Sequence, residues 1–288
     1  SKTEIGIVEM GANHQKEIEF LCEIAQPDFG YITNFGKAHL EGFGGTEGVI
    51  KGKSEMYQFL SENNKFVFVN LDDTIQREKT EKNLRITFSQ TDKNASVLIN
   101  EIKANPFVEI TYDGIKVKSN LIGLYNANNI NAAITIGKYF KVSNEEIKEA
   151  IESYIPENNR SQMLVKNSNE IILDAYNANP SSMEVAIKNF LQLEKENKIA
   201  VLGDMFELGE ESFEEHKHIV SLLENEPEVK TYFVGSQFYA NKMDSEFVFF
   251  HETFEDFSNF IKEEKLQNQL ILIKGSRGMA LERTLELL

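Results

Sequence analysis

The sequence has very little cysteine and no tryptophan. Cys22 is the one cysteine in 288 residues, so a disulfide framework is excluded and a reducing compartment is expected. Its spacing from Ile18, Leu21 and Ala25 is that of an apolar helix face, which predicts a core residue. No apolar stretch is long enough to span a bilayer, and the N-terminus lacks the basic-then-apolar pattern of a secretory signal. These absences predict a cytoplasmic protein.

Basic residues are also scarce. The chain has 30 Lys and Arg against 46 Asp and Glu, a formal net charge of -16. Binding to nucleic acid needs a basic face that releases counterions, so a nucleic-acid partner is disfavoured. An acidic protein can still hold phosphate groups if metal ions, helix N-termini or a few well-placed cations assist it.

The length of the chain favours two domains over one. In the first half, apolar runs alternate with segments of helical periodicity, which predicts parallel strands joined by crossover helices. The expected strands are 5–9, 29–35 and 66–69, and the expected helices are 17–25 and 46–60. This order predicts a doubly wound α/β arrangement.

Short alternating segments replace that pattern between about residues 84 and 122. Asp113-Gly114 separates two of them, and this dipeptide between alternating runs is a strong signal for a hairpin. We expect a small antiparallel sheet here, appended to the parallel one. Two helices should follow, at 127–139 and 144–154.

A polar stretch, Pro156 to Asn159, has the composition of a domain joint. Strands and helices alternate after it, which predicts a Rossmann-like open sheet. The expected strands are 171–174, 199–202, 232–234, 247–250 and 270–273. The predicted domains are therefore 1–156 and 157–288.

Polar residues follow the first of those later strands directly. Residues 174–183 read DAYNANPSSM after the apolar run 171–173, and the carboxyl end of a strand is where ligands bind in open α/β sheets. Asp174 can accept hydrogen bonds from sugar hydroxyls, and Asn177 and Asn179 can both donate and accept. A turn with a helix N-cap is the alternative interpretation.

Three further segments also place polar or charged residues at the end of an expected strand. They are 9–14 (EMGANH), 202–209 (LGDMFELG) and 274–277 (KGSR). Together with 174–183 they resemble the Mur ligase family of ATP-dependent amide-bond-forming enzymes. The resemblance implies an α/β protein with a central ATP-binding domain, incomplete at its N-terminus, that has a parallel sheet plus a small antiparallel sheet. A Rossmann-like C-terminal ligase domain would follow.

A magnesium site in the first domain is one implication of the resemblance. Glu9 and His39 would be Mg²⁺ ligands, and so would Lys53 after carbamylation, since Mg²⁺ prefers oxygen ligands. Carbamylation requires a neutral amine, so the pKa of Lys53 must fall from about 10.4. Alternatively, Glu9 caps a helix, His39 is a solvated loop residue and Lys53 lies on an exposed charged face. The glycines near His39 do not form a dinucleotide fingerprint and predict loop flexibility: Gly42, Gly44, Gly45 and Gly48.

A second implication is an ATP site. Asn126 and Asn129, one helical turn apart, would reach the adenine, whose edge needs both a donor and an acceptor. Arg160 would contact nucleotide phosphate or ribose, and Asp174 with Asn177 would complete the site. Asn126 as a helix cap and Arg160 as a solvated linker charge are the alternatives.

The remaining segments are assigned to the substrates. Their candidate residues are Asn179, Asp204, Glu207, Lys274, Ser276 and Arg277. The loop 274–277 could hold peptide carboxylates because it combines cations with a hydroxyl. The acids of the 202–209 loop could instead favour the dipole of the helix that follows.

The activity that the resemblance implies is ligation of D-alanyl-D-alanine to a UDP-N-acetylmuramoyl tripeptide through an acyl phosphate, in peptidoglycan precursor synthesis. The family's phosphate-binding loop, G-x-x-x-x-G-K-[ST], is missing from the sequence. We therefore expect a C-terminal portion of such an enzyme, inactive by itself and monomeric in its full-length form.

Two alternatives stay open. The chain could belong to another ligase of the same superfamily, such as a folylpolyglutamate-type ligase, which differs in its acceptor and incoming amine. It could also be a non-catalytic binding module, because it lacks the phosphate-binding loop.

Overall fold

The computed structural model describes residues 3–37, 39–157, 159–264 and 266–288. It divides into two compact units that interleave along the chain. The first unit is Ser1–Glu101, Ile110–Lys116 and Asn128–Lys148, and the second is Ile102–Glu109, Val117–Ala127 and Glu149–Leu288. The predicted single boundary after residue 156 stays a prediction, and Asn158 of the predicted joint lies outside the described residues.

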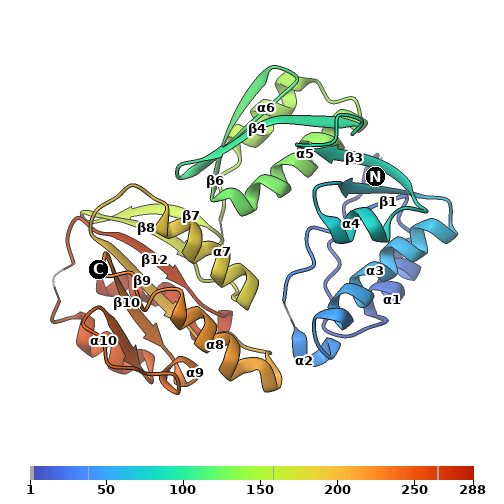
Figure 1. Cartoon of the computed structure of the whole chain (residues 1–288). Helices are drawn as coiled ribbons and strands as arrows, with labels where there is room; N and C mark the ends of the chain where they lie inside the picture. The colour runs from blue at the N-terminus through green and yellow to red at the C-terminus, as the bar shows by residue number, and fades with distance from the viewer. Residues whose placement is uncertain (1–2, 38, 158, 265) are drawn as a thin grey trace. The chain divides into compact units, whose positions relative to one another are not determined.

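Six strands form the first sheet in the order in which they occur in the chain (Figure 1). They are β1 Phe29–Tyr31, β2 Phe66–Asn70, β3 Leu84–Ser89, β4 Val97–Ala104, β5 Phe107–Tyr112 and β6 Ile115–Ile122. The pairs β1–β2, β2–β3 and β3–β4 are parallel. The antiparallel part therefore starts later than predicted, because Leu84–Ser89 still pairs in parallel with β2.

The predicted hairpin is present. β5 ends at Tyr112 and β6 begins at Ile115, so two residues join neighbouring strands. Asp113 and Gly114 have φ values of 48° and 77°, the left-handed conformations that tight hairpin turns require and that Asp-Gly tolerates well. The Asp113-Gly114 dipeptide alone was therefore sufficient to predict the hairpin.

The predicted strand 5–9 is wrong. Residues 3–12 have no regular secondary structure, and Ile7 is 95% exposed. β1 lies at one end of the strand order and pairs only with β2, so no described strand pairs with residues 5–9. An apolar run forms a strand only where a neighbouring backbone completes its hydrogen bonds.

The helices of the first half are α1 Glu17–Ala25, α2 Leu40–Phe43, α3 Thr46–Glu62, α4 Thr74–Lys79, α5 Ala127–Tyr139 and α6 Asn144–Ser153, with a 3-10 turn η1 Leu124–Asn126. α1 and α3 pack on the first sheet through a buried cluster that contains Cys22, Leu60 and Val67, each fully buried. On the other face, Tyr139 contacts the ring of Phe68. Cys22 is thus a core residue, as predicted.

The glycines near His39 serve close packing more than flexibility. A Cβ on Gly42 would lie 2.3 Å from the carbonyl oxygen of Asn13, and one on Gly48 would lie 1.9 Å from that of Phe43. Gly44, with φ 74°, ends α2 in the left-handed conformation. The prediction of loop flexibility is therefore wrong for Gly42 and Gly48, because Gly42 lies directly against the backbone of Asn13 and Gly48 against that of Phe43.

The second sheet has the order β11-β10-β9-β12-β8-β7. Its strands are β7 Gln162–Lys166, β8 Asn169–Asp174, β9 Lys198–Gly203, β10 Val229–Val234, β11 Val248–His251 and β12 Leu270–Lys274. β8 to β12 pair in parallel, which confirms the Rossmann-like prediction, whereas β7 is antiparallel to β8. β7, a short strand at the edge of the sheet, was not among the predicted strands.

Helices cover both faces of this sheet. They are α7 Pro180–Leu191, α8 Ser212–Ser221, α9 Ser236–Tyr239 and α10 Phe254–Ile261, with 3-10 segments η2 Gly209–Glu211, η3 Arg277–Met279 and η4 Leu281–Leu287. Phe257 of α10 and Leu281 of η4 join one buried cluster with alternate residues of β8, β9, β10 and β12. α7 and α8 contact one another and lie on the opposite face (Figure 1).

Candidate functional site

The strand order of the second unit places three of the predicted segments side by side. β12 lies between β9 and β8, and Lys274 is paired in register with Asp174 on one side and Leu202 on the other. Because these strands are parallel, their carboxyl ends meet at one edge of the sheet. The segments 174–183, 202–209 and 274–277 all leave from this edge.

Asp174 and Lys274 form an ion pair at the centre of this edge. The Lys274 Nζ–Asp174 Oδ2 distance is 2.6 Å, and the side chains are 2% (Lys274) and 14% (Asp174) exposed. Lys274 also donates to the carbonyl of Asn177 at 3.2 Å, and Asp174 Oδ1 accepts from the backbone N–H of Ser161 at 3.1 Å. The ammonium predicted to hold a substrate carboxylate is therefore already paired in this conformation, and the removal of either partner would leave a desolvated charge.

Tyr125 and Ser161 extend this network, and the sequence analysis did not identify them. Their hydroxyls lie 2.8 Å apart. Burial raises the pKa of the Tyr125 phenol, and the charge of Asp174 raises it further, so the phenol remains a neutral hydrogen-bonding group. Tyr125 directly precedes the predicted nucleotide residue Asn126, and this position could have indicated a site residue. A tyrosine of the protein core would occupy such a position equally well.

Arg160 lies beside the same edge. Its guanidinium is exposed and stacks on the ring of Tyr176, with 3.9 Å between the guanidinium carbon and the ring centroid. Tyr176 is 40% exposed. Such stacking holds the guanidinium plane while its N–H groups remain able to donate to an anion.

The two asparagines of the 174–183 segment differ in their contacts. Asn179 caps α7: its side chain accepts from the backbone N–H of Ser182, and Pro180 takes the first helical position. This confirms the turn-and-cap interpretation for Asn179. Asn177 is exposed, and its Oδ1 accepts from the N–H of Ala178 at 2.9 Å. Of the two amides, Asn177 is the more accessible to a ligand.

Asp204 is a buried structural residue in this conformation. It is 3% exposed, and its two carboxylate oxygens accept from the backbone N–H groups of Gln237 and Phe238, each at 3.0 Å. Glu207, by contrast, is exposed and has a φ of 62°. Both remain predicted substrate residues, but only Glu207 is accessible.

Ser276 of the 274–277 segment holds the two neighbouring segments, 202–209 and 174–183, by hydrogen bonds. The hydroxyl of Ser276 accepts from the backbone N–H of Phe206 at 2.9 Å and donates to the carbonyl of Ala178 at 3.3 Å. Arg277 is 60% exposed and pairs with Glu282 at 2.8 Å. An exposed ion pair of this kind contributes little free energy, so a ligand can replace it at small cost.

In the first unit, the surroundings of Lys53 favour the neutral amine that carbamylation would require. It lies in α3, as predicted, and its Nζ donates to the carbonyl of Asn34 at 2.9 Å. Desolvation lowers the pKa of Lys53, which raises the fraction of neutral amine. Glu55, two residues further, is 8% exposed and accepts from the backbone N–H groups of Lys16 and Glu19, so it fixes the start of α1.

The other predicted magnesium ligands lie on irregular segments. Glu9 is exposed in the segment before α1. His39 is the N-cap residue of α2, with a φ of 54°, and is half-buried; Ala38 beside it lies outside the described residues. Within the part of the chain that the structure describes, no group of three or more His, Cys, Asp or Glu side chains is placed to hold a metal ion. The Mg²⁺ site stays a prediction.

The predicted adenine residues have different surroundings. Asn126, in η1, is 8% exposed and its amide donates to the carbonyl of Ile122 at 2.8 Å. Asn129, in the first turn of α5, is exposed. Asn126 is thus a buried residue bonded to its own turn, whereas Asn129 lies at the surface.

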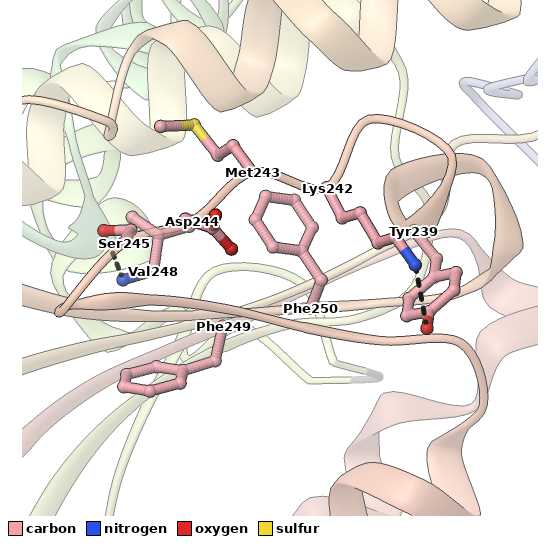
Figure 2. A pocket seen from close by; sticks show the side chains of 8 residues that line it. All are labelled: Tyr239, Lys242, Met243, Asp244, Ser245, Val248, Phe249 and Phe250. Carbon is pink, nitrogen blue, oxygen red and sulfur yellow. Dashed lines mark hydrogen bonds between the residues drawn. The ribbon is translucent and has the colours of Figure 1, made fainter.

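A hollow of about 450 Å³ lies elsewhere in the second unit, between the end of α9 and the start of β11 (Figure 2). Tyr239, Lys242, Met243, Asp244, Ser245, Val248, Phe249 and Phe250 line it. None of the predicted site residues is among them. The hollow is therefore not part of the candidate site.

The helices that the structure describes include none with the length and apolar character of a membrane-spanning segment.

Comparison with known proteins matches both halves of the chain to one family. Residues 1–137 match the Mur ligase middle domain, and residues 159–277 match the Mur ligase glutamate ligase domain. The UDP-N-acetylmuramoyl-tripeptide--D-alanyl-D-alanine ligase of Bacillus subtilis is 31% identical over 97% of this chain and 63% of its own length. The enzyme of that name from Buchnera aphidicola of Acyrthosiphon pisum is 32% identical over 98% of this chain and 64% of its own length.

Solved structures agree. A crystal structure of MurF from Acinetobacter baumannii superposes with a TM-score of 0.83 at 29% identity, covering 96% of this chain and 62% of that one. A pseudomurein peptide ligase type C from Methanothermus fervidus has the same fold, with a TM-score of 0.71 at 15% identity over 97% of this chain and 67% of that one. The chain spans less than two thirds of the length of the curated relatives named above.

Proposed function

Because the chain belongs to the Mur ligase family, we propose that it serves the ATP-dependent ligation of D-alanyl-D-alanine to a UDP-N-acetylmuramoyl tripeptide. One observation carries the proposal: relatives with that activity in their names match 97–98% of this chain at 31–32% identity. The reaction belongs to peptidoglycan precursor synthesis in the cytoplasm.

The reaction has two steps. A carboxylate oxygen of the tripeptide attacks the γ-phosphorus of ATP, which gives an acyl phosphate and ADP. The dipeptide amine then attacks the acyl carbon, loses a proton, and the tetrahedral intermediate expels phosphate. The protein forms no covalent intermediate, so its residues act by positioning and by electrostatic stabilisation.

Residues of the second unit suit the nucleotide. Asp174 keeps acceptor capacity for ribose hydroxyls, because a carboxylate has about four lone-pair positions and Lys274 and Ser161 occupy two. Arg160, stacked on Tyr176, can donate to phosphate or ribose oxygens. Asn177 would add an exposed amide. Asn126 of the second unit and Asn129 of the first unit would contact the adenine.

The first unit would contribute the anionic groups. A neutral Lys53 amine can attack CO₂ and release a proton, which gives a carbamate anion, and the lowered pKa of Lys53 favours this step. Glu9, His39 and carbamylated Lys53 would hold Mg²⁺, which would offset charge on the transferred phosphoryl group.

The test is phosphate release by a full-length ligase that contains this sequence, measured with UDP-N-acetylmuramoyl tripeptides that differ in their third residue. Release should require ATP, a tripeptide and D-alanyl-D-alanine together, and the product should gain the mass of the dipeptide less water. Activity with a single amino acid or glutamate as the amine, and none with the dipeptide, would favour another ligase of the superfamily. No release with any amine would favour a binding module.

A further inference from the structure

The loop that follows β9 is held by hydrogen bonds to three other segments, two of which contribute side chains. The backbone N–H of Met205 donates to His216 Nε2 of α8 at 3.0 Å, and that of Phe206 donates to Ser276 Oγ at 2.9 Å. The carboxylate of Asp204 anchors the loop to the start of α9. Two successive backbone donors are thus satisfied by side chains, which fixes the path of the chain at this point.

His216 is built into this loop as a neutral acceptor. It is fully buried, and its Nδ1 donates to the carbonyl of Ser212 at 2.7 Å, so Nε2 carries the lone pair that faces Met205. The ring of Phe238 covers it edge-on, with centroids 4.6 Å apart. The charged groups that face His216 are Asp204, 3.9 Å from Nε2, and Glu215 on its own helix.

The tip of the loop points away from the core. Met205 and Leu208 are 1% and 3% exposed, whereas Phe206 between them is 45% exposed. Glu207 has a left-handed φ of 62°, a conformation that is unfavourable for a non-glycine residue and persists only where the surroundings impose it. The buried flanks and the two side-chain acceptors impose it here.

The tip presents groups that suit a small zwitterionic peptide. Phe206 offers an aromatic face and Glu207 a carboxylate, and both attract an ammonium group. Arg277, exposed next to Gly278, offers a guanidinium for a carboxylate. Gly278 lies against the Phe206 ring, where a Cβ would be 2.7 Å from Cε2. D-alanyl-D-alanine carries one ammonium, one carboxylate and two methyl groups that could pack on the ring.

We propose that His216 is a positioning residue, which holds the Phe206-Glu207 tip in the conformation that binds the incoming dipeptide. This inference rests on the proposed function for the identity of the dipeptide. The fixing of the tip by His216 is a property of the chain itself and can be tested separately.

The first experiment measures amide hydrogen exchange on the 288-residue chain. His216→Leu removes the acceptor at similar volume, and exchange of the Met205 amide should become at least about tenfold faster, as expected for one lost hydrogen bond. His216→Gln can place a side-chain oxygen near the Nε2 position and should keep most of the protection. His218→Leu, on the exposed side of the same helix, is the matched control and should behave as the parent.

The second experiment measures steady-state kinetics in a full-length ligase that contains this sequence. His216→Leu should raise the KM for D-alanyl-D-alanine about tenfold and leave the KM for ATP unchanged, and His216→Gln should restore the parent value. If His216→Leu does not fold, Phe206→Ala replaces it, because an exposed side chain can be removed without unfolding. Phe206→Ala should raise the same KM with the Met205 amide still protected.

The outcomes separate the two levels of inference. Faster Met205 exchange with an unchanged dipeptide KM would overturn the positioning role, and so would equal losses for ATP and dipeptide, which indicate a general structural defect. An unchanged Met205 exchange rate would overturn the fixing of the tip. A parent enzyme that does not use the dipeptide would refute the proposed function. The exchange experiment would still test whether His216 fixes the tip, because it does not depend on the substrate.

Discussion

The ion pair between Asp174 and Lys274 gives the sharpest prediction about stability. Asp174→Ala would leave an ammonium that is 2% exposed with the carbonyl of Asn177, at 3.2 Å, as its remaining partner. Breaking a buried pair costs about 3–5 kcal/mol, and the remaining partner places the expected loss near the lower end. Lys274→Met should cost less, about 1–2 kcal/mol, because Asp174 is 14% exposed and keeps the N–H of Ser161.

The double variant distinguishes pairing from simple loss of contacts. Asp174→Ala combined with Lys274→Met removes both charges, so its loss should be about 2 kcal/mol smaller than the sum of the two single losses. Native-state hydrogen exchange of the β12 amides is the appropriate assay. The chain has two compact units, so a single unfolding curve would not be two-state.

Two results would refute this reasoning. Asp174→Ala within about 1 kcal/mol of the parent would mean that the ammonium of Lys274 reaches water. Strict additivity in the double variant would mean that the two charges do not stabilise one another. Lys188→Met removes an exposed ion pair with Glu184 and should change the exchange of β12 by no more than about 0.5 kcal/mol.

Three further predictions concern other parts of the chain. In the full-length ligase, Lys53→Ala should abolish most ligation, and a short carboxylic acid in the buffer should restore part of it; parent-level kcat with CO₂ removed would disprove the carbamate role. Gly48→Ala should destabilise the first unit by about 1–3 kcal/mol through its clash with Phe43, measured by exchange of the α3 amides. Burial lowers the pKa values of His216 and His251 below the ordinary 6.5. The unfolded chain then binds more protons at mildly acidic pH, so the stability of the second unit should be full above about pH 6.5 and fall as the pH decreases; a flat profile from pH 7 to 5 would contradict this.

Sequence periodicity was most reliable where an element carries its own signal. The helix 127–139 and the five parallel strands of the second sheet were located within a few residues, because a buried parallel strand is a nearly continuous apolar run. Asp113-Gly114 identified a hairpin for a similar reason, since the left-handed conformation is a property of those two residues. The identity of the family also came from the sequence, in short segments that chemistry constrains.

The errors arose where the outcome depended on a partner. Residues 5–9 have the apolar composition of a strand, but a strand needs a neighbouring backbone, and none of the described strands pairs with them. Gly42 and Gly48 looked like flexible loop residues because a sequence does not show that Asn13 and Phe43 pack against them. β7 was missed because an edge strand is defined by the strand beside it.

The candidate site divides in the same way. Sequence position and motif resemblance predicted that Asp174, Lys274 and the 202–209 loop belong to one site, because each lies at the end of an apolar strand, and their functional roles stay predictions. Only the strand order, with β12 between β8 and β9, decided that Asp174 and Lys274 pair. Only the packing of α9 against the loop decided that Asp204 is buried, whereas Glu207 is exposed. A sequence lists which groups are charged. Their partners and their burial depend on residues up to a hundred positions away, as in the pair of Lys274 with Asp174. These partners decide which hydrogen-bonding groups a ligand can still use.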